Sequence, residues 1–261
     1  MKTGELRLRL KNINGRILFE ESYVRGAFKL GKPLWRNGIP LYYLLHVGGG
    51  YISGDLYTQD IELLDHTSLY LTTQAATKVY KGAVPAVVST KIKIGEHSHL
   101  SLLQDPLILY EHATFHQTTE IELADTSTFY YSEIITPGWS PKKKLFTYRE
   151  LYNHFSIRRG GKLFYLDRLF WQNGQQTLLQ LGAYTHYGSY ICIEQLPTSF
   201  FDQLNELTDE QCEIGYSKLD KEGFVLKVVA NQTQHIEAVF QKVDDLLRLR
   251  KKENPLCLRK Y

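Results

Sequence analysis

Cysteine, long apolar runs and excess charge are all scarce in this sequence. Its 261 residues include 3 cysteines, namely Cys192, Cys212 and Cys257, which form no C-x-x-C pair. They argue against a disulfide framework and a structural zinc site, and they fit a reducing compartment. No run of about 18 apolar residues is present, so no membrane-spanning helix is predicted. A net charge of +3 is too small to indicate nucleic acid binding by itself. Residues 1–5 carry charge and no apolar signal-peptide core, so we expect a cytoplasmic protein.

Aromatic and β-branched residues are abundant, and both kinds favour strands. The chain has 18 tyrosines and 12 phenylalanines. Short segments of alternating or continuous apolar residues recur with turn residues between them, which indicates an all-β layered fold. We predict strands over residues 5–11, 16–23, 41–47, 55–63, 68–73, 86–94, 100–103, 118–123, 128–135, 148–158, 162–170, 177–184, 190–194 and 224–229.

Two segments have helical rather than strand periodicity. Residues 200–207 form the first, with Ser199 and Asp202 as its predicted capping pair. In residues 236–247, apolar side chains repeat every three or four positions, and Asn231 is the predicted N-cap. We find neither an internal repeat nor a linker, and therefore expect one domain over the whole chain.

A glycine-rich segment from Gly48 to Asp55 is the most distinctive local pattern. A phosphate-binding loop of the Gly-x-x-x-x-Gly-Lys-Ser/Thr type is excluded, because Asp55 stands where the lysine is needed. The dinucleotide pattern Gly-x-Gly-x-x-Gly also fails, because Ser53 takes the place of its third glycine. The residues that follow alternate as a strand does. A tight turn between two strands is the simple interpretation.

Histidines give only weak candidates for a metal site. His97 and His99 are two positions apart, so on a strand both could face one cation, whereas in a turn they would be solvated. His112 and His116 lie four apart without a helical pattern, and their roles stay open. His46 lies within a predicted buried strand, where the alternative is a core histidine whose hydrogen bonds are satisfied.

No pattern joins a nucleophile to a base. No serine lies in Gly-x-Ser-x-Gly, and no pair of carboxylates can be assigned to acid–base work. Lys142–Lys144 form a basic loop that we expect to be solvated. The residues alone therefore assign no catalytic site. A β-rich hydrolase or transferase is the remaining catalytic alternative.

Four ordered segments resemble the urease accessory proteins of the UreD type, called UreH in some bacteria. These segments are the glycine-rich stretch ending at Asp55, Thr73–Tyr80, Gln104–Ile108 and Glu133–Gly138. The resemblance extends from about residue 5 to the end of the chain. The sequence departs from the family pattern at His112, which replaces an aspartate, and at Trp139 and Lys142–Lys144.

The resemblance implies a β-rich fold with stacked, β-helix-like sheets and two helices, one of them near the C-terminus. It also implies a non-catalytic scaffold that binds urease apoprotein together with UreF and the GTPase UreG, and that helps to deliver nickel to the urease active site. No permanently bound cofactor is expected, and nickel would only pass through. A homodimer within a larger complex is a further expectation. The alternative is a scaffold that holds its partners without contacting metal.

Under this interpretation, separate carboxylates and an imidazole suit weak nickel binding during transfer. Asp55, Glu133 and His46 are the predicted transit residues. The matched segments supply the expected structural or functional residues Gly49, Gly50, Gly54, Thr73, Gln74, Lys78, Tyr80, Asp105, Pro106 and Pro137.

Overall fold

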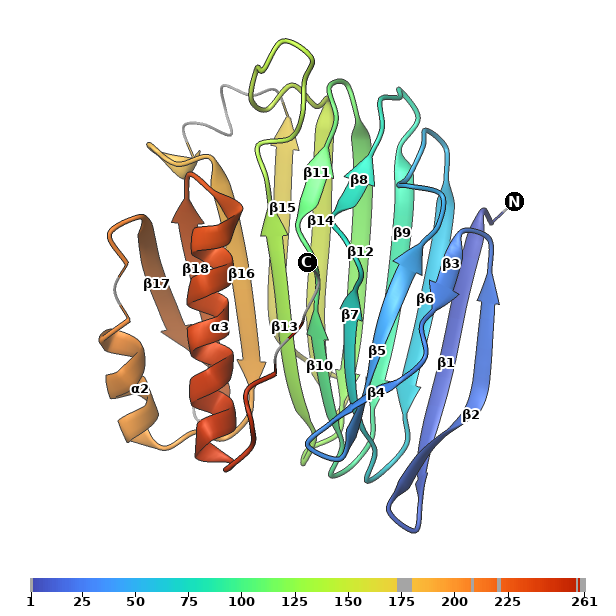
Figure 1. Cartoon of the computed structure of the whole chain (residues 1–261), viewed down its shortest axis with the longest axis vertical. Helices are drawn as coiled ribbons and strands as arrows, with labels where there is room; N and C mark the ends of the chain where they lie inside the picture. Colours follow the sequence, from blue (N-terminus) through green and yellow to red (C-terminus); the bar gives the residue numbers. More distant parts are fainter. Residues whose placement is uncertain (1, 173–179, 208, 220–221, 257, 259–261) are drawn as a thin grey trace.

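Strands dominate the computed structural model of the protein, which describes residues 2–172, 180–207, 209–219, 222–256 and 258 (Figure 1). All of the described strands belong to two sheets. The first sheet has the order β15 (Lys162–Gln172), β14 (Glu150–Arg159), β12 (Thr114–Leu123), β9 (Ala86–Ile94), β6 (Leu56–Leu63), β1 (Gly4–Ile13) and β2 (Arg16–Arg25).

The second sheet is the larger one, and it lies against the first. Its main path is β17 (Cys212–Lys218), β18 (Gly223–Ala230), β16 (His186–Ile193), β13 (Thr128–Ile135), β10 (His99–Leu103), β7 (Ser68–Thr73), β5 (Ile39–His46) and β3 (Phe28–Leu30). Three short strands join it beside this path: β4 (Leu34–Arg36), β8 (Thr77–Val79) and β11 (Leu107–Leu109).

The middle of the chain winds as a coil of parallel strands. Strands β6, β9 and β12 stack in one sheet while β7, β10 and β13 stack in the other, all in parallel register. Leu63, Ile94 and Leu123 therefore occupy the same position in consecutive turns. The predicted all-β fold with stacked, β-helix-like sheets is confirmed. The sequence shows no internal repeat, yet the structure repeats from turn to turn, because the turns share strand register and side-chain direction rather than residue identity.

Side chains between the two sheets form the main core. On β9, Val88 and Ile92 point inward and are buried, whereas Lys91 and Lys93 point outward and are exposed. This alternation follows from the two-residue period of a strand. Each fully buried aliphatic side chain contributes roughly 1.5–3 kcal/mol, so the long inner faces hold the coil together.

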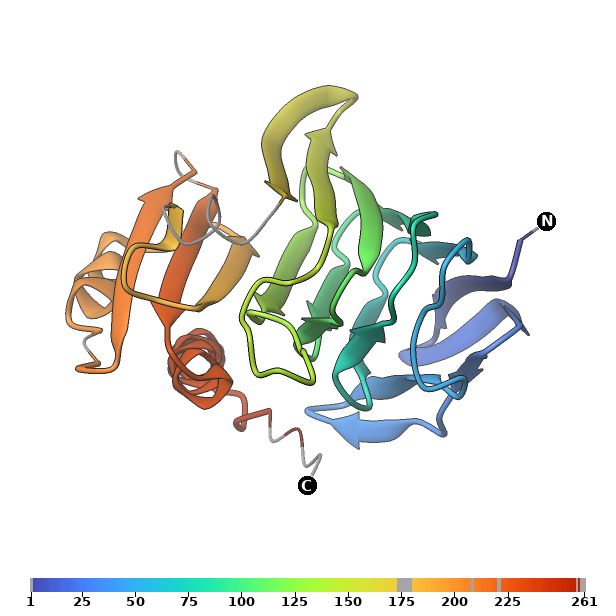
Figure 2. The same ribbon diagram turned by 90° about the horizontal axis from the view of Figure 1, so that it is seen from above.

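Both described α-helices cover the outer face of the sheet formed by β16 and β18 (Figures 1 and 2). Helix α2 spans Thr198–Asn205 and helix α3 spans Thr233–Arg250. Phe200 of α2 and Ile236 of α3 share a second apolar cluster with Phe224 of β18. The chain therefore has a core on each face of these strands.

Two predicted helix caps are wrong. Helix α2 begins after Pro197, so Ser199 and Asp202 lie inside it instead of capping it. Helix α3 has Gln232 rather than Asn231 at its N-cap, and its cap makes no side-chain hydrogen bond. Tertiary packing of the apolar faces sets where these helices begin, because that packing outweighs the small contribution of a cap.

The predicted strand over residues 177–184 lies partly outside the described residues. Residues 180 and 181 are helical and the next two form a turn, so a strand there is wrong. Among the described residues, no helix is both long and apolar enough to cross a membrane.

Candidate functional site

The glycine-rich segment forms a tight turn between β5 and β6. The carboxylate of Asp55 accepts a hydrogen bond from the backbone N–H of Ile52 at 2.8 Å, and its own N–H donates to the Ile52 carbonyl at 3.1 Å. Gly49 and Gly54 adopt φ angles of 77° and 81°, a region that favours glycine because other residues clash there. A strand follows the turn. The expected strand-to-strand turn is therefore confirmed.

Gly50 brings this turn against the segment Thr73–Tyr80. A Cβ atom at Gly50 would lie 2.5 Å from the Lys78 carbonyl oxygen, which leaves no room for a side chain. Tyr51 donates its backbone N–H to the same oxygen at 2.8 Å, and its carbonyl accepts from the N–H of Tyr80 at 2.9 Å. Two of the motifs identified in the sequence are thus bonded side by side.

The segments around Thr73 and Asp105 are joined by a reciprocal pair of hydrogen bonds. The Thr73 hydroxyl donates to the Asp105 carboxylate at 2.8 Å and accepts from the Asp105 N–H at 2.8 Å. The N–H of Thr77 donates to the Pro106 carbonyl at 2.9 Å. Asp105 is buried, and its bond to the Thr73 hydroxyl reduces the cost of burying a carboxylate.

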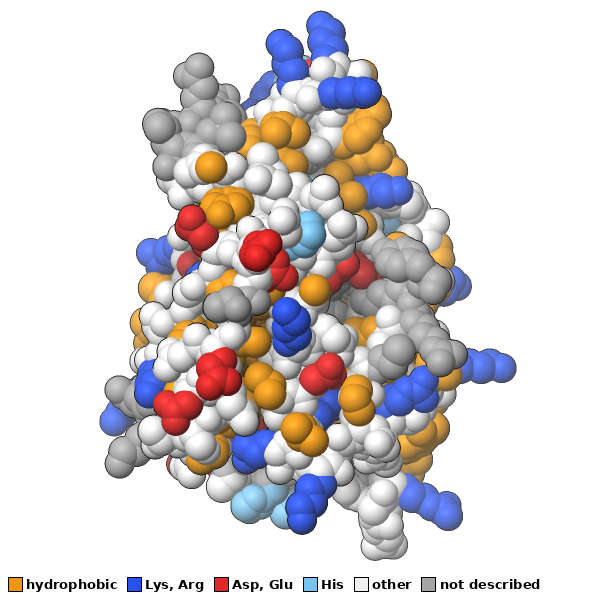
Figure 3. All heavy atoms as spheres, turned by 60° about the vertical axis from the view of Figure 1, so that its left-hand side comes forward, with side chains coloured by type: hydrophobic (Ala, Val, Ile, Leu, Met, Phe, Trp, Pro, Cys, Tyr) orange, Lys and Arg blue, Asp and Glu red, His pale blue; other side chains and the backbone are white. Residues whose placement is uncertain are grey.

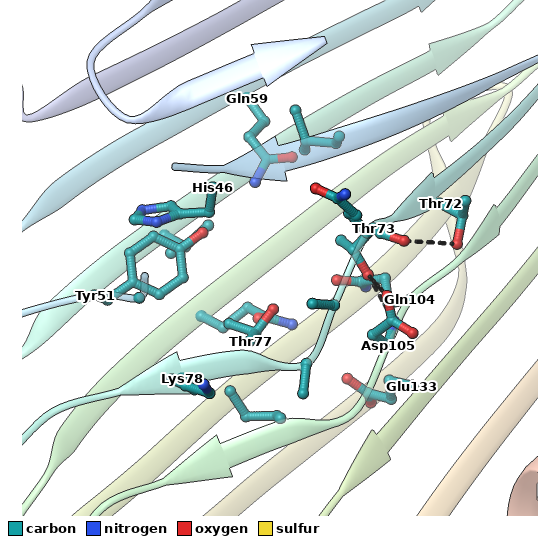
Figure 4. Close-up of a pocket in the computed structure, with 18 of the residues that line it drawn as sticks. His46, Tyr51, Gln59, Thr72, Thr73, Thr77, Lys78, Gln104, Asp105 and Glu133 are labelled. Carbon is teal, nitrogen blue, oxygen red and sulfur yellow. Dashed lines mark hydrogen bonds between the residues drawn. The ribbon is translucent and has the colours of Figure 1, made fainter. Parts of the chain in front are cut away.

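A cavity of about 210 Å³ lies between the sheets where these segments meet. Figure 4 shows His46 and Tyr51 on one side of it and Gln104, Asp105 and Glu133 on the other. Among the predicted site residues, it is lined by His46, Gly49, Gly50, Thr73, Gln74, Lys78, Asp105 and Glu133. The other predicted residues are not part of its lining: Gly54, Asp55, Tyr80, Pro106 and Pro137.

His46 presents an imidazole without hydrogen bonds to this cavity. Neither ring nitrogen has a partner among the described residues, although both are buried from solvent. Its ring is surrounded by those of Tyr51, Tyr57 and Phe28, at centroid distances of 4.7, 5.2 and 5.9 Å. Burial lowers the pKa of His46, and the negative charge of Asp55 only partly opposes this. No described side chain satisfies the imidazole, as a core histidine would require, and a neutral ring keeps a lone pair for a ligand.

Glu133 places a carboxylate at the other side of the cavity. Its two oxygens accept from the side-chain amide of Asn153 at 3.1 and 3.0 Å, and one also accepts from the Tyr131 hydroxyl at 3.1 Å. Burial raises the pKa of Glu133, against the opposing effect of the Lys227 ammonium. Glu133 is half-buried, and a carboxylate held by neutral donors can attract a cation without an internal ion pair to break.

Asp55 lies behind this cavity rather than on its wall. One carboxylate oxygen closes the glycine turn, and the side chain is 7% exposed. Its charge still reaches the cavity, because it raises the pKa of Tyr51 and Tyr57 in addition to the dominant effect of burial. Direct contact between Asp55 and a passing metal stays a prediction.

Polar side chains on the inner strand faces complete the cavity, and sequence reasoning missed them. Gln59, Thr90 and Thr119 stand in one register across β6, β9 and β12, and Gln117 lies on the same inner face. Each is a polar residue at an inward position of an otherwise apolar face. This break in the inward pattern becomes visible only once the strand register is known.

His97 and His99, the weak candidate pair for a cation, do not face a common site. The His97 ring stacks on that of His66 at 5.0 Å, on an exposed turn. The ring nitrogens of His99 instead bond to the hydroxyls of Thr128 and Ser101 at 2.7 and 2.8 Å. The two imidazoles thus face different surroundings, because the turn ends between them and β10 begins at His99.

The remaining histidines of interest lie apart from the cavity lining. His112 adopts φ 61° in a turn, and His116 bonds through Nε2 to Glu150 at 2.5 Å. The described residues contain no group of three or more histidine, cysteine, aspartate or glutamate side chains that could hold a metal ion. The cavity therefore offers single ligands rather than a closed coordination cage.

Comparisons with known proteins match nearly the whole chain to one family. The sequence model of the family described as UreD urease accessory protein matches residues 2–260. The chain is 34% identical to "Urease accessory protein UreD" of Lachnoclostridium phytofermentans, covering 99% of this chain and 98% of that protein. It is 33% identical to the protein of the same name from Bacillus sp. strain TB-90, over 94% of each chain, and 32% identical to that of Actinomyces naeslundii, over 99% of each.

Proposed function

The chain belongs to the UreD family of urease accessory proteins, and from that premise we propose that it is a scaffold through which nickel passes to urease apoprotein. In this proposal the chain catalyses no reaction. It binds urease apoprotein together with UreF and the GTPase UreG, and it forms a homodimer within the larger complex. The proposed location is the cytoplasm, which agrees with the few, widely spaced cysteines.

The orphaned imidazole of His46 is the observation that carries the metal-transfer part of the proposal. Its unpartnered nitrogens face a cavity whose other side holds the Glu133 carboxylate. Nickel accepts both imidazole nitrogen and carboxylate oxygen. A cavity with one such group at each side can bind the ion weakly and release it, whereas a cage of three or four ligands would retain it.

The second predicted carboxylate takes part through its charge. Asp55 is too engaged in closing the glycine turn to move freely, yet its charge acts on His46 and on Tyr51. This negative charge beside the imidazole favours a cation at that side of the cavity.

The test compares His46→Gln with Glu133→Gln, because both substitutions keep polarity and approximate size. Each variant is co-expressed with urease, UreF and UreG, and urease activation is measured with the amount of assembled complex. We expect intact complexes and activation lowered by roughly tenfold or more, the scale on which altered metal sites lose affinity. His97→Gln, on an exposed turn outside the cavity lining, is the matched control.

A scaffold without metal contact is the second candidate. It is favoured by the absence of a three-ligand group among the described residues. Equilibrium dialysis of nickel against the purified complex separates the two candidates. Nickel bound by the wild-type complex and lost in His46→Gln supports transfer through the cavity. Equal binding by both complexes, together with normal activation, contradicts it and leaves the pure scaffold.

A further inference from the structure

Three aromatic side chains form a row on the outside of the coil. Tyr80, Tyr110 and Trp139 follow the second-sheet strands of consecutive turns, and adjacent rings lie 4.9 Å apart in each case. The Tyr80 hydroxyl donates to the Gly49 carbonyl at 3.1 Å. The row therefore begins at the glycine turn that lines the cavity and ends on the loop between β13 and β14.

Exposed apolar side chains extend this row at the same end of the molecule. Trp139 is 50% exposed and Leu145, on the same loop, is 47% exposed. Val84 is 60% exposed, and its carbonyl accepts from the N–H of Gly54 in the glycine turn. Large exposed apolar groups that adjoin one another commonly mark a surface that a partner covers.

Three consecutive lysines, Lys142–Lys144, adjoin the apolar residues on this loop, and all three are exposed. None of the ion pairs between described residues uses any of them. The loop projects at the top of Figure 1, and Figure 3 shows basic side chains gathered at that tip with hydrophobic side chains beside them. We define the tip surface as Tyr80, Val84, Tyr110, Trp139, Lys142–Lys144 and Leu145.

The loop that carries the tip surface is held in one conformation. The N–H of Trp139 donates to the Leu109 carbonyl at 2.9 Å, and the N–H of Phe146 donates to the Pro137 carbonyl at 2.7 Å. Phe146 is buried, and both it and Lys143 adopt positive φ angles of 54° and 56°. Backbone conformations of this kind cost free energy and persist where surrounding structure fixes them, often at functional surfaces. The exposed groups are therefore presented in a preformed arrangement.

We propose that the tip surface is the docking site for an acidic segment of a partner protein in the urease-maturation complex, with an apolar side chain of that segment packed against Trp139. Charge complementarity makes an acidic partner the one that suits these lysines, and the aromatic row supplies the kind of anchor that dominates interfaces. A two-fold contact between two copies through this surface does not fit, because it would bring two lysine clusters together. The inference rests on the proposed function, which supplies the partner proteins.

The test reverses the charge at the tip surface and measures binding to purified UreF, UreG and urease apoprotein separately. The variant K142E/K143E/K144E is expected to raise the Kd for one of these partners by about tenfold or more. Added salt should weaken wild-type binding and affect this variant much less. The control K29E/K32E/K162E makes the same change of charge at exposed lysines on β3, β15 and the segment after β3, and it should bind normally.

The apolar anchor is tested by Trp139→Ala and by Leu145→Ser, which leaves the stacked aromatic row intact. Both are expected to weaken the same partner while the salt dependence of binding is retained. Normal binding by the charge-reversal variant and both apolar variants would overturn the inference but not the proposed function. If none of the three candidate partners binds the wild-type chain, the proposed function is contradicted, and the inference that rests on it is contradicted as well. Equal affinity of the wild type for duplex DNA or anionic vesicles would also overturn the choice of a protein partner.

Discussion

At the scale of single residues, buried polar groups in and around the cavity differ in whether they have partners. The Asp55 carboxylate accepts a hydrogen bond from a backbone N–H, and the Asp105 carboxylate accepts one from the Thr73 hydroxyl. These bonds stabilise the fold. His46 has no such partner among the described residues. Burying its ring nitrogens without hydrogen bonds lowers the stability of the fold. Under the proposed function, His46 is retained for a ligand rather than for folding.

Glu133 should make stability depend on pH. Burial raises its pKa in the folded protein above the ordinary value of 4.5, so the folded state binds the proton more tightly than the unfolded state. The stability that protonated Glu133 contributes is therefore fully present below pH 4.5. It is lost as the pH rises through the raised pKa of the folded protein. We expect Glu133→Gln to gain stability relative to wild type over this range, by at most about 1.4 kcal/mol per pH unit.

Urea unfolding of both proteins between pH 4 and 8 measures this difference. Glu210→Gln, which changes an exposed carboxylate, serves as control. A stability difference between wild type and Glu133→Gln that is constant across the pH range would contradict the burial of an ionisable group at this position.

Single residues also show why the cavity was only half predictable. The matched motifs identified Thr73, Lys78 and Asp105, and these do line it. Gln117 and Thr119 were missed, because a polar residue in a strand is indistinguishable from an outward one until the register is known. The prediction of β12 was also too short: the strand begins at Thr114 rather than at residue 118, so Gln117 lay outside the predicted strand.

At the scale of strands, length and alternation decided which elements could be predicted. Strand β9 alternates throughout and was predicted with its observed ends, Ala86–Ile94. Strands β8 and β11 have three residues each, too few to show a period, and both were missed. Their positions follow from the coil, since β11 pairs in parallel with β8 and with β13.

Charges on the outer face of the first sheet support its strand order. Paired positions on six neighbouring strands alternate in sign along one row. The row consists of Glu21, Arg9, Glu62, Lys93, Glu122 and Arg158. Every member has opposite charges beside it, so this face is internally neutralised, unlike the tip surface, and a slip of one strand would remove the alternation.

Lys93→Glu tests this arrangement. The substitution places a third carboxylate between those of Glu62 and Glu122, and we expect the free energy of unfolding to fall by roughly 1 kcal/mol. The loss should shrink at 1 M salt, where charges are screened within about 3 Å. Lys93→Gln removes the attraction without adding repulsion and should cost less. A loss that is the same at low and high salt would show that charge alternation does not stabilise the sheet.

At the scale of the whole molecule, two apolar cores share one sheet. The inner faces of β16 and β18 contribute Ile191 and Val225 to the core of the coil, while their outer faces contribute Tyr190 and Phe224 to the core beneath the helices. Because the same strands belong to both cores, neither can lose its packing without disturbing the other. The expected single domain stays a prediction, and this shared sheet is its physical basis.

A buried ion pair within helix α3 carries the arginine that joins this helix to the coil, and it provides the test. Arg248 is 2% exposed; it bonds to Asp244 at 2.5 and 3.1 Å and reaches the Tyr70 hydroxyl of β7 at 2.9 Å. Arg248→Ala would leave the Asp244 carboxylate buried without its partner, so we expect a loss of about 3–5 kcal/mol. The double variant Asp244→Asn with Arg248→Met removes both charges and should recover part of it.

Calorimetry of these variants decides whether the chain unfolds as one unit. One transition that moves as a whole to lower temperature, with calorimetric and van't Hoff enthalpies in agreement, is expected if the shared strands couple the two cores. Two separate transitions, of which only the one assigned to α3 moves in Arg248→Ala, would mean that the helical end is an independent domain. The coil that holds the cavity would then be stable without the helices, because its inward side chains alone would suffice to hold the two sheets together.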